Sequence, residues 1–401
     1  MYRPRSWHAP LVALALVMAG CSEHPDDGLV APQFAKPGAG GGGGGGGGST
    51  PPAGVQVIDL TPAGSVGNPQ NRAFGTGVRA GVVLGHGYLA VSGARAMRIT
   101  VTRDGAGSTS ASAPEFLPVF ETGRSYGTTI GYDGRLFGSD GNRAGYFTES
   151  EAVLLPFPQD AEGTWVPAVS AGPNRSGTVV GASVHPERVA GGWPLPYWRA
   201  TLWEPNAADY TPVLLPVLRP GSAEREQATG IAGNGVVAGY SYDGKQGSVA
   251  FVARPDGAGG YQLEQLAGRA ATASGMSDGG IVIGTVGNSA VRWLPVNGTY
   301  GAPQLLPSGG EDGSTPAAIN DAGDIAGERA YKSRNTIRRV AVLWRCNASV
   351  AVELPPVAGY TSSSAEQIDD DGYVIGRSWG TSGSTAIATA TLWDVSKLPP
   401  C

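Results

Sequence analysis

The sequence predicts an all-β protein that folds as a seven-bladed β-propeller of four-stranded antiparallel blades. Two observations predict this fold. Composition is the first: 64 glycines, 31 prolines and only 15% charged residues favour short strands joined by tight turns. The second is a repeat with steps of 43 to 58 residues, a period typical of propellers, solenoids and arrays. Each repeat contains two glycines four positions apart around a mostly apolar triplet: Gly81/Gly85, Gly134/Gly138, Gly177/Gly181, Gly235/Gly239, Gly280/Gly284, Gly323/Gly327 and Gly372/Gly376.

Residues 1–20 are expected to be a lipoprotein signal peptide. Arg3 and Arg5 precede an apolar stretch, Leu11 to Met18, that is too short to span a bilayer. The run Met18-Ala19-Gly20-Cys21 resembles a bacterial lipobox, which implies that Cys21 carries lipid. Ser22 after the cysteine implies sorting to the outer membrane, facing either the periplasm or the cell surface. The alternative is an ordinary signal peptide followed by an unmodified cysteine.

Residues 21–54 are predicted to form a disordered tether. They include nine consecutive glycines, Gly40 to Gly48, and several prolines, so they cannot bury a core. The repeat domain is expected to occupy residues 55–401. Removal of residues 1–20 takes away Arg3 and Arg5 and changes the formal charge from −5 to −7. A mildly acidic chain without a basic run argues against nucleic acid as a partner.

Four short strands are expected in each repeat. The first carries a small residue and an aliphatic one three positions later, as in Ala228–Ile231, and a turn rich in Asn, Asp and Gly follows it. The glycine-bracketed triplet is the second strand. The third has alanine followed three positions later by a large residue, as in Ala390/Trp393. The fourth ends in Leu-Pro, as in Leu354-Pro355, which suits an outer edge because proline cannot donate to a ladder.

A closed ring is favoured over a linear array because a ring hides strand edges. Little chain follows Trp393, whereas Val55 to Leu60 precedes the first repeat and has strand character. This N-terminal segment is therefore a candidate for completing the last blade.

The repeat resembles that of the bacterial extracellular HAF-repeat family. The similarity is carried by Ala317–Gly327 and by Val249-Ala250-Phe251, and it extends over about residues 73–394. It implies export and a repeat β fold. The histidine of the family motif is absent, and the resemblance implies no activity.

No catalytic centre is predicted. Two Gly-x-Ser-x-Gly strings, at residues 123–127 and 275–279, lack the following helix that a nucleophile elbow needs. The acidic residues do not single out a pair for glycoside hydrolysis; the candidates are Asp133, Glu187, Glu264, Glu328 and Glu366. Few histidines and isolated acidic turns such as Asp369–Asp371 argue against a metal centre, and no cofactor is expected.

A long aromatic loop is the predicted binding surface. In the repeat at Gly177 the third-strand alanine, Ala200, lies 19 positions after Gly181, and the long connection between them includes Trp193, Tyr197, Trp198 and Arg199. An antiparallel meander places it on the same face as the connection that carries Trp165. Trp and Tyr are favoured anchors for proteins and sugars. The alternative is that these aromatic side chains pack on one another.

A disulfide is expected between Cys346 and Cys401, the two cysteines after Cys21. They follow equivalent third strands of the last two repeats. The function predicted from the sequence is a lipid-anchored binding or scaffold module of the cell envelope, with a polysaccharide or an envelope protein as its ligand. A glycan hydrolase or lyase and a structural assembly subunit are the alternatives.

Overall fold

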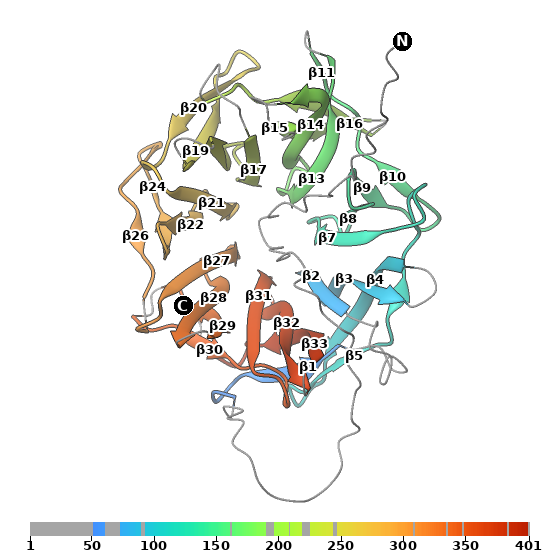
Figure 1. The fold of residues 1–401 in the computed structure, drawn as a ribbon, viewed down its shortest axis with the longest axis vertical. Coiled ribbons are helices and arrows are strands. Elements are labelled where there is room, and N and C mark those ends of the chain that lie inside the picture. Colours follow the sequence, from blue (N-terminus) through green and yellow to red (C-terminus); the bar gives the residue numbers. More distant parts are fainter. Residues whose placement is uncertain are drawn as a thin grey trace, which may run out of the picture.

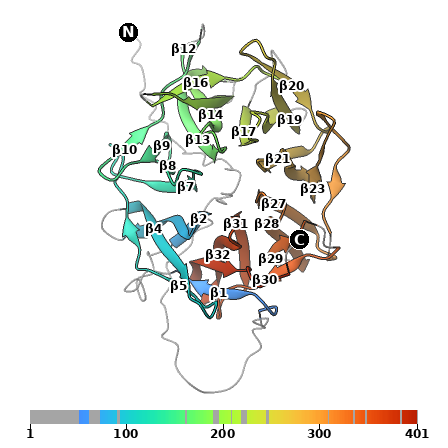
Figure 2. The ribbon, with the colours of Figure 1, turned by 180° about the vertical axis from the view of Figure 1, so that it is seen from behind.

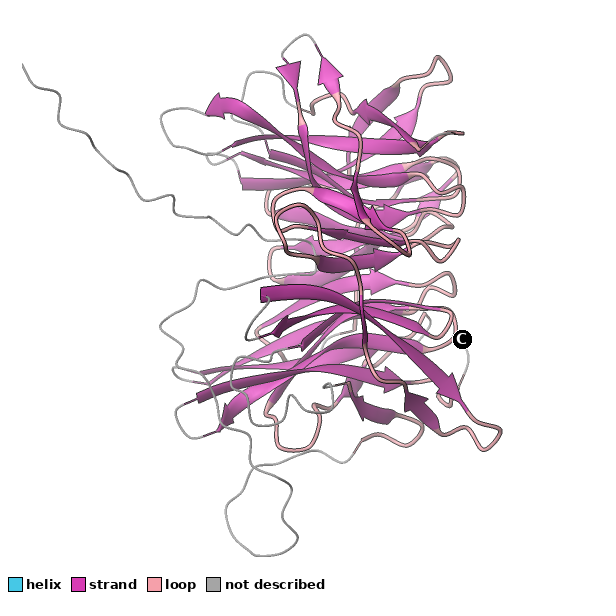
Figure 3. Ribbon diagram, turned by 90° about the vertical axis from the view of Figure 1, so that its right-hand side faces the viewer, coloured by secondary structure: helices cyan, strands magenta, loops and turns pink. Residues whose placement is uncertain are grey.

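A computed structural model describes residues 51–60, 73–89, 93–160, 163–189, 196–207, 209–218, 225–243, 247–307, 309–333, 336–346, 349–382 and 385–399. All regular elements in these residues are β-strands (Figure 3). This confirms the all-β prediction.

Five antiparallel sheets of four or five strands each form one blade. The first contains β2 (Ala73–Arg79), β3 (Val82–Leu89), β4 (Gly93–Arg103), β5 (Thr109–Ala111) and β6 (Glu115–Phe116). The second contains β7 (Tyr126–Ile130), β8 (Leu136–Ser139), β9 (Ala144–Phe147) and β10 (Ala152–Leu154). The third contains β21 (Ala271–Met276), β22 (Val282–Val286), β23 (Ser289–Trp293) and β26 (Gln304–Leu305). The fourth contains β27 (Gly313–Ile319), β28 (Ile325–Ser333), β29 (Thr336–Trp344) and β30 (Val352–Leu354). The last contains β31 (Ser362–Ile368), β32 (Tyr373–Ser382), β33 (Thr385–Asp394) and β1 (Gln56–Asp59).

An eight-stranded sheet completes the ring. It contains β13 (Val166–Pro173), β14 (Val179–Val189), β15 (Pro196–Pro205), β16 (Tyr210–Leu214), β17 (Arg225–Ile231), β18 (Val237–Asp243), β19 (Gly247–Pro255) and β20 (Tyr261–Gln265). One parallel pair, Trp198 opposite Arg225, joins its two halves, whereas all its other pairs are antiparallel. Two short ribbons lie apart from these sheets: β11 (Gln159–Asp160) with β12 (Gly163–Thr164), and β24 (Pro295–Val296) with β25 (Thr299–Tyr300).

The sheets stand around a central axis as in a β-propeller (Figures 1 and 2). The first strand of each repeat lies nearest the axis, and later strands lie progressively outward. The N-terminal strand closes the ring, because β1 pairs antiparallel with β33 over four residues, from Gln56 opposite Asp394 to Asp59 opposite Thr391. This confirms the expected role of the segment before the first repeat.

The two glycines of a pair have different structural roles. Gly372 has a φ of +82° in the turn between β31 and β32, a conformation that favours glycine. Gly376 lies opposite Ala365 on β31, and a Cβ atom at Gly376 would come within 2.0 Å of the carbonyl oxygen of Ser364. The spacing of four residues therefore combines a tight turn with a close approach of two strands.

The third-strand tryptophans are buried and join neighbouring sheets. Trp203, Trp293, Trp344 and Trp393 are at most 1% exposed. Three of them donate indole hydrogen bonds to the carbonyl oxygen of a Leu-Pro proline in the preceding sheet: Trp203 to Pro156, Trp344 to Pro307 and Trp393 to Pro355. Apolar residues from adjacent sheets also pack together, such as Val78 and Val83 with Ile375 and Leu392. The core is thus distributed between the blades.

Candidate functional site

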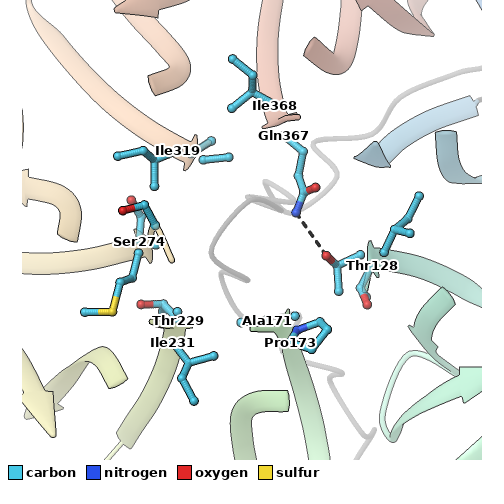
Figure 4. A pocket seen from close by; sticks show the side chains of 18 of the residues that line it. Thr128, Ala171, Pro173, Thr229, Ile231, Ser274, Ile319, Gln367 and Ile368 are labelled. Carbon is cyan, nitrogen blue, oxygen red and sulfur yellow. Dashed lines mark hydrogen bonds between the residues drawn. The ribbon is translucent and has the colours of Figure 1, made fainter. Parts of the chain in front are cut away.

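A cavity of about 170 Å³ lies on the axis, and a recurring distortion of the inner strands builds its wall. Each inner strand has a β-bulge, where the pairing register shifts by one residue opposite the second glycine of the repeat. The bulged residues line the cavity: Thr76, Thr128, Ala171, Thr229, Ser274, Ala317 and Glu366. Figure 4 shows the inner strands with the side chains of Thr128, Ala171, Thr229 and Ser274 arranged around the axis. We call this set the bulge ring.

Three hydroxyls of the bulge ring bind the next inner strand. Thr76 Oγ1 lies 3.0 Å from the carbonyl oxygen of Gly127, Thr229 Oγ1 lies 3.1 Å from that of Ala273, and Ser274 Oγ lies 2.7 Å from that of Pro316. A hydroxyl has one proton, so donation to these carbonyls leaves oxygen lone pairs as acceptors at the cavity wall. The ring therefore both joins adjacent sheets and presents acceptors to the axis.

Gln227 supplies a donor in the same wall. Its side chain is only 4% exposed, and its Oε1 accepts a hydrogen bond of 3.0 Å from the hydroxyl of Tyr240. Its Nε2 is buried and has no hydrogen-bond partner in the structure. A buried amide without a partner costs stability, and each such group in a native fold calls for an explanation.

Glu366 contributes a carboxyl group to the bulge ring. Its side chain is 13% exposed, and its Oε1 accepts a hydrogen bond of 3.1 Å from Ser364 Oγ and lies 3.7 Å from Nε of Arg377. Burial raises the pKa of Glu366 to about 7; the charge of Glu328 acts in the same direction, and Arg377 opposes both. Beside it, Gln367 Nε2 donates a hydrogen bond of 3.2 Å to Thr129 Oγ1 (Figure 4).

A cap of turn residues borders the cavity on one face of the ring. We call this the turn face, because it carries the turns between first and second strands. The ring of Tyr132 lies between the guanidinium groups of Arg79, at 3.7 Å, and Arg175, at 4.7 Å. Arg175 pairs with Asp278 at 3.1 Å and also with Asp321, which is on a different sheet. Four charged or aromatic side chains that line the cavity meet here: Arg79, Tyr132, Asp278 and Asp321.

A second cleft, of about 300 Å³, opens on the turn face between β7–β10 and β13–β16. Arg135 lies over the rings of Tyr146 and Tyr210, at 4.9 and 5.5 Å, and donates a hydrogen bond of 3.1 Å to the Tyr210 hydroxyl. The Tyr146 hydroxyl donates to Asp209. The guanidinium group of Arg135 already covers these ring faces, so a ligand cannot stack on them. The axial cavity, whose polar wall can form hydrogen bonds, is therefore the stronger candidate for a binding site.

Of the predicted aromatic site, Trp165 lies in the interior. This side chain is fully buried, lies edge-on to His185 at 5.1 Å and lies beneath the guanidinium group of Arg199 at 5.5 Å. Arg199 in turn donates a hydrogen bond of 2.6 Å to the carbonyl oxygen of Leu215. The structure therefore brings Trp165 and Arg199 together as packing partners, with Trp165 buried and Arg199 partly exposed.

Other predicted positions are only partly described. Tyr197 and Trp198 are half-buried on β15, and Trp193 lies outside the described residues. Cys346 is disulfide-bonded. Cys401 and Cys21 lie outside the described residues, so the Cys346–Cys401 pairing and the lipidation remain predictions.

Within the described ranges, no group of three or more His, Cys, Asp or Glu side chains could hold a metal ion. The same part of the chain contains no helix with the length and apolar character needed to cross a bilayer.

The bulge ring was not predicted from the sequence, although the sequence contains a signal for it. The polar residue that follows the small residue of the first-strand motif, such as Thr229 after Ala228, is the one that the bulge turns toward the axis. Glu366 occupies the same recurring position but is the one member of the bulge ring with a carboxyl group, and Gln227 lies outside the bulge positions, so the repeat pattern alone marks neither side chain.

Comparisons with known proteins reveal distant structural likenesses. No family model and no curated protein matches the sequence. A gluconolactonase from Xanthomonas campestris is similar in structure, with 9% identity, 85% of this chain and 89% of that chain covered, and a TM-score of 0.39. The polysaccharide lyase Uly1 matches with 9% identity, 79% and 89% coverage and a TM-score of 0.41. A sialidase from Trypanosoma rangeli matches with 10% identity, 86% and 60% coverage and a TM-score of 0.36. Likenesses this weak carry no argument about activity.

Proposed function

We propose that this protein is an exported, lipid-anchored β-propeller that binds a sugar-sized polar group of an envelope polysaccharide in its axial cavity. The observation that carries the proposal is the polar lining of the cavity, in which Gln227 stands with the bulge ring. The Nε2 of Gln227 is buried and has no hydrogen-bond partner in the structure. Hydroxyl lone pairs and a carboxyl group surround the same space. Sugars carry hydroxyl groups that both donate and accept, so they complement such a mixed wall.

We also propose that the ring has seven blades. The halves of the eight-stranded sheet, β13–β16 and β17–β20, each repeat the four-strand order of the other sheets, and one parallel pair joins them. Each half has its own bulge residue in the cavity wall, Ala171 and Thr229. These features support counting the halves as two blades.

Saccharide binding tests the proposed ligand class. The full-length chain in detergent is titrated calorimetrically with glucose, galactose and soluble fragments of cell-wall polysaccharide. Gln227→Leu should lose binding because it removes the unpartnered donor. The matched control is Gln262→Leu, an exposed position on β20, and it should bind like the parent. If none of these saccharides binds, or if Gln227→Leu binds unchanged, the proposal is wrong.

The anchoring proposal is tested separately. Cys21→Ser should move the protein from the membrane fraction to the soluble fraction, or leave the precursor unprocessed. Continued fractionation of the processed variant with membranes would contradict lipid attachment at Cys21.

A glycan hydrolase remains the second candidate function, because of one observation. Glu366 holds a carboxyl group with a pKa of about 7, which suits a general acid, and the charge of Glu328 lies close enough to raise this value. Release of reducing sugar from the same polysaccharide fragments, lost in Glu366→Gln, would favour the enzyme over the binding module.

A further inference from the structure

We propose that the axial cavity selects a protonated amine, so that its ligand is a hexosamine unit with a free amino group; this rests on the proposed saccharide-binding function. The inference follows from the hydrogen-bonding character and charge of the wall. An ammonium group offers only donors, and it needs acceptors arranged around it.

The bulge ring supplies those acceptors. Thr76, Thr229 and Ser274 line the cavity and donate their hydroxyl protons to carbonyl oxygens of neighbouring strands, so their oxygens keep lone pairs that can accept a hydrogen bond. The carboxyl group of Glu366 stands in the same ring. An ammonium group at this level would meet hydroxyl oxygens and a carboxyl oxygen from several sheets.

The charged side chains of the lining leave Glu366 as the carboxyl group that a cation would meet. The lining contains the carboxyl groups of Asp278, Asp321 and Glu366 and the guanidinium group of Arg79. Asp278 and Asp321 are both paired with Arg175, which does not line the cavity. Arg79 lies against Tyr132 in the cap, whereas Glu366 belongs to the bulge ring. Arg377, the other cation close to Glu366, donates a hydrogen bond of 3.2 Å to Ser364 Oγ and does not line the cavity.

Gln227 adds a second requirement, a hydrogen-bond acceptor on the ligand. Its buried Nε2 is a donor, so the amine must be attached to a group with an oxygen acceptor. A sugar hydroxyl or ring oxygen provides one. A simple alkylamine satisfies the acceptors of the wall but leaves Gln227 without a partner.

Burial leaves Glu366 with a pKa of about 7, so part of the population holds a proton at neutral pH in the absence of a ligand. A bound ammonium group would favour the ionised carboxylate. Binding of a hexosamine near pH 7 should therefore release protons, which a calorimeter detects as a dependence of the binding enthalpy on the buffer.

Three sugars of similar size test the proposal by calorimetry: glucosamine, N-acetylglucosamine and glucose. They differ in whether the second carbon carries an ammonium, an amide or a hydroxyl group. The full-length chain should bind glucosamine at least about tenfold more tightly than the other two, a ratio typical of one charge-assisted hydrogen bond. Glu366→Gln should reduce the preference to less than about threefold, and Glu149→Gln, at an exposed position, should leave it unchanged.

The outcomes separate this inference from the function on which it rests. Equal binding of glucosamine and glucose would overturn the amine selection and leave saccharide binding standing. Equal binding of glucosamine and N-acetylglucosamine would overturn it too. If no sugar binds, both proposals fail. If Glu366→Gln does not fold, Ser274→Ala should weaken glucosamine binding more than glucose binding, and an unchanged ratio would count against the inference.

Discussion

The indole Nε1 of Trp393 donates a hydrogen bond of 2.7 Å to the carbonyl oxygen of Pro355, which follows the outer strand of the preceding sheet. Trp293 occupies the equivalent third-strand position, but its indole nitrogen is buried without a partner. The outer strand that precedes it, β20, is followed by Leu266-Ala267 in place of Leu-Pro, and the carbonyl oxygen of Ala267 accepts a hydrogen bond of 2.7 Å from Gln265. The Leu-Pro motif thus coincides with a hydrogen bond between sheets.

Trp393→Phe should therefore destabilise the fold more than Trp293→Phe. Both changes remove similar buried area, but only the first breaks a hydrogen bond and leaves the Pro355 carbonyl without its donor. The expected difference is about 1–2 kcal/mol. Urea unfolding of the two variants measures it, and equal losses would show that the indole hydrogen bond contributes nothing.

Gly376→Ala should destabilise the protein by about 2–4 kcal/mol, because the added methyl group would overlap the carbonyl of Ser364 and force two strands apart. Gly301→Ala is the control, since a Cβ there meets nothing within 4 Å and its φ is not positive. Thermal unfolding compares them. A mild effect at Gly376 would mean that the strands adjust easily.

Asp394 should make the last sheet sensitive to acid. Burial alone would raise its pKa, but hydrogen bonds from Arg103, Thr109 and Ser396 outweigh burial and hold the pKa at about 2. This value lies below the ordinary 3.8, so the contribution to stability is present above about pH 4 and is lost as the pH falls toward 2. Asp394→Asn should flatten the dependence of unfolding free energy on pH in that window, and a parallel curve would refute the assignment.

Glu366 should affect the pH dependence of stability in the opposite direction, making the protein less stable as the pH rises. Because its pKa rises from 4.5 to about 7 on folding, its contribution is most favourable below about pH 4.5 and declines as the pH rises to 7. Glu366→Gln should remove that decline and make the variant relatively more stable at pH 8. Denaturation curves at pH 5 and pH 8 decide it; a parent whose stability does not fall over this range would contradict the raised pKa.

The bond from Cys346 is predicted to reach Cys401, the cysteine that follows the last described strand in sequence. Intact-mass analysis after alkylation without reductant should find neither thiol modified, and Cys401→Ser should leave one thiol at Cys346 to be alkylated. Loss of the disulfide should cost about 2–4 kcal/mol. Two modified thiols in the parent would exclude the bond.

The fold could be predicted from the sequence wherever the same physical requirement recurs in every repeat. A tight turn and a close strand contact each require glycine, so the pair Gly372/Gly376 and its counterparts mark the turns and second strands. The closing strand could also be predicted from a deficit of chain after Trp393. The axial site could not be predicted, because Glu366 faces the cavity through a bulge whereas Gln227 is paired in regular register opposite Tyr240, and nothing in the repeat singles out either side chain. The burial of Trp165 could not be predicted, because an aromatic residue in a connection has the same sequence signature whether it is buried or exposed.

The closure of the ring by β1 has a mechanical consequence. The proposed lipid anchor at Cys21 precedes β1 in sequence, so tension between the membrane and a bound polysaccharide would be transmitted first to the strand that closes the ring. The antiparallel pairing of β1 with β33 resists this load, as does the side-chain amide of Gln56, which exchanges two hydrogen bonds with the backbone of Thr109. Detachment of β1 would open the propeller at the junction of its first and last sheets, so the force at which this strand yields would limit the load that the anchored protein can bear.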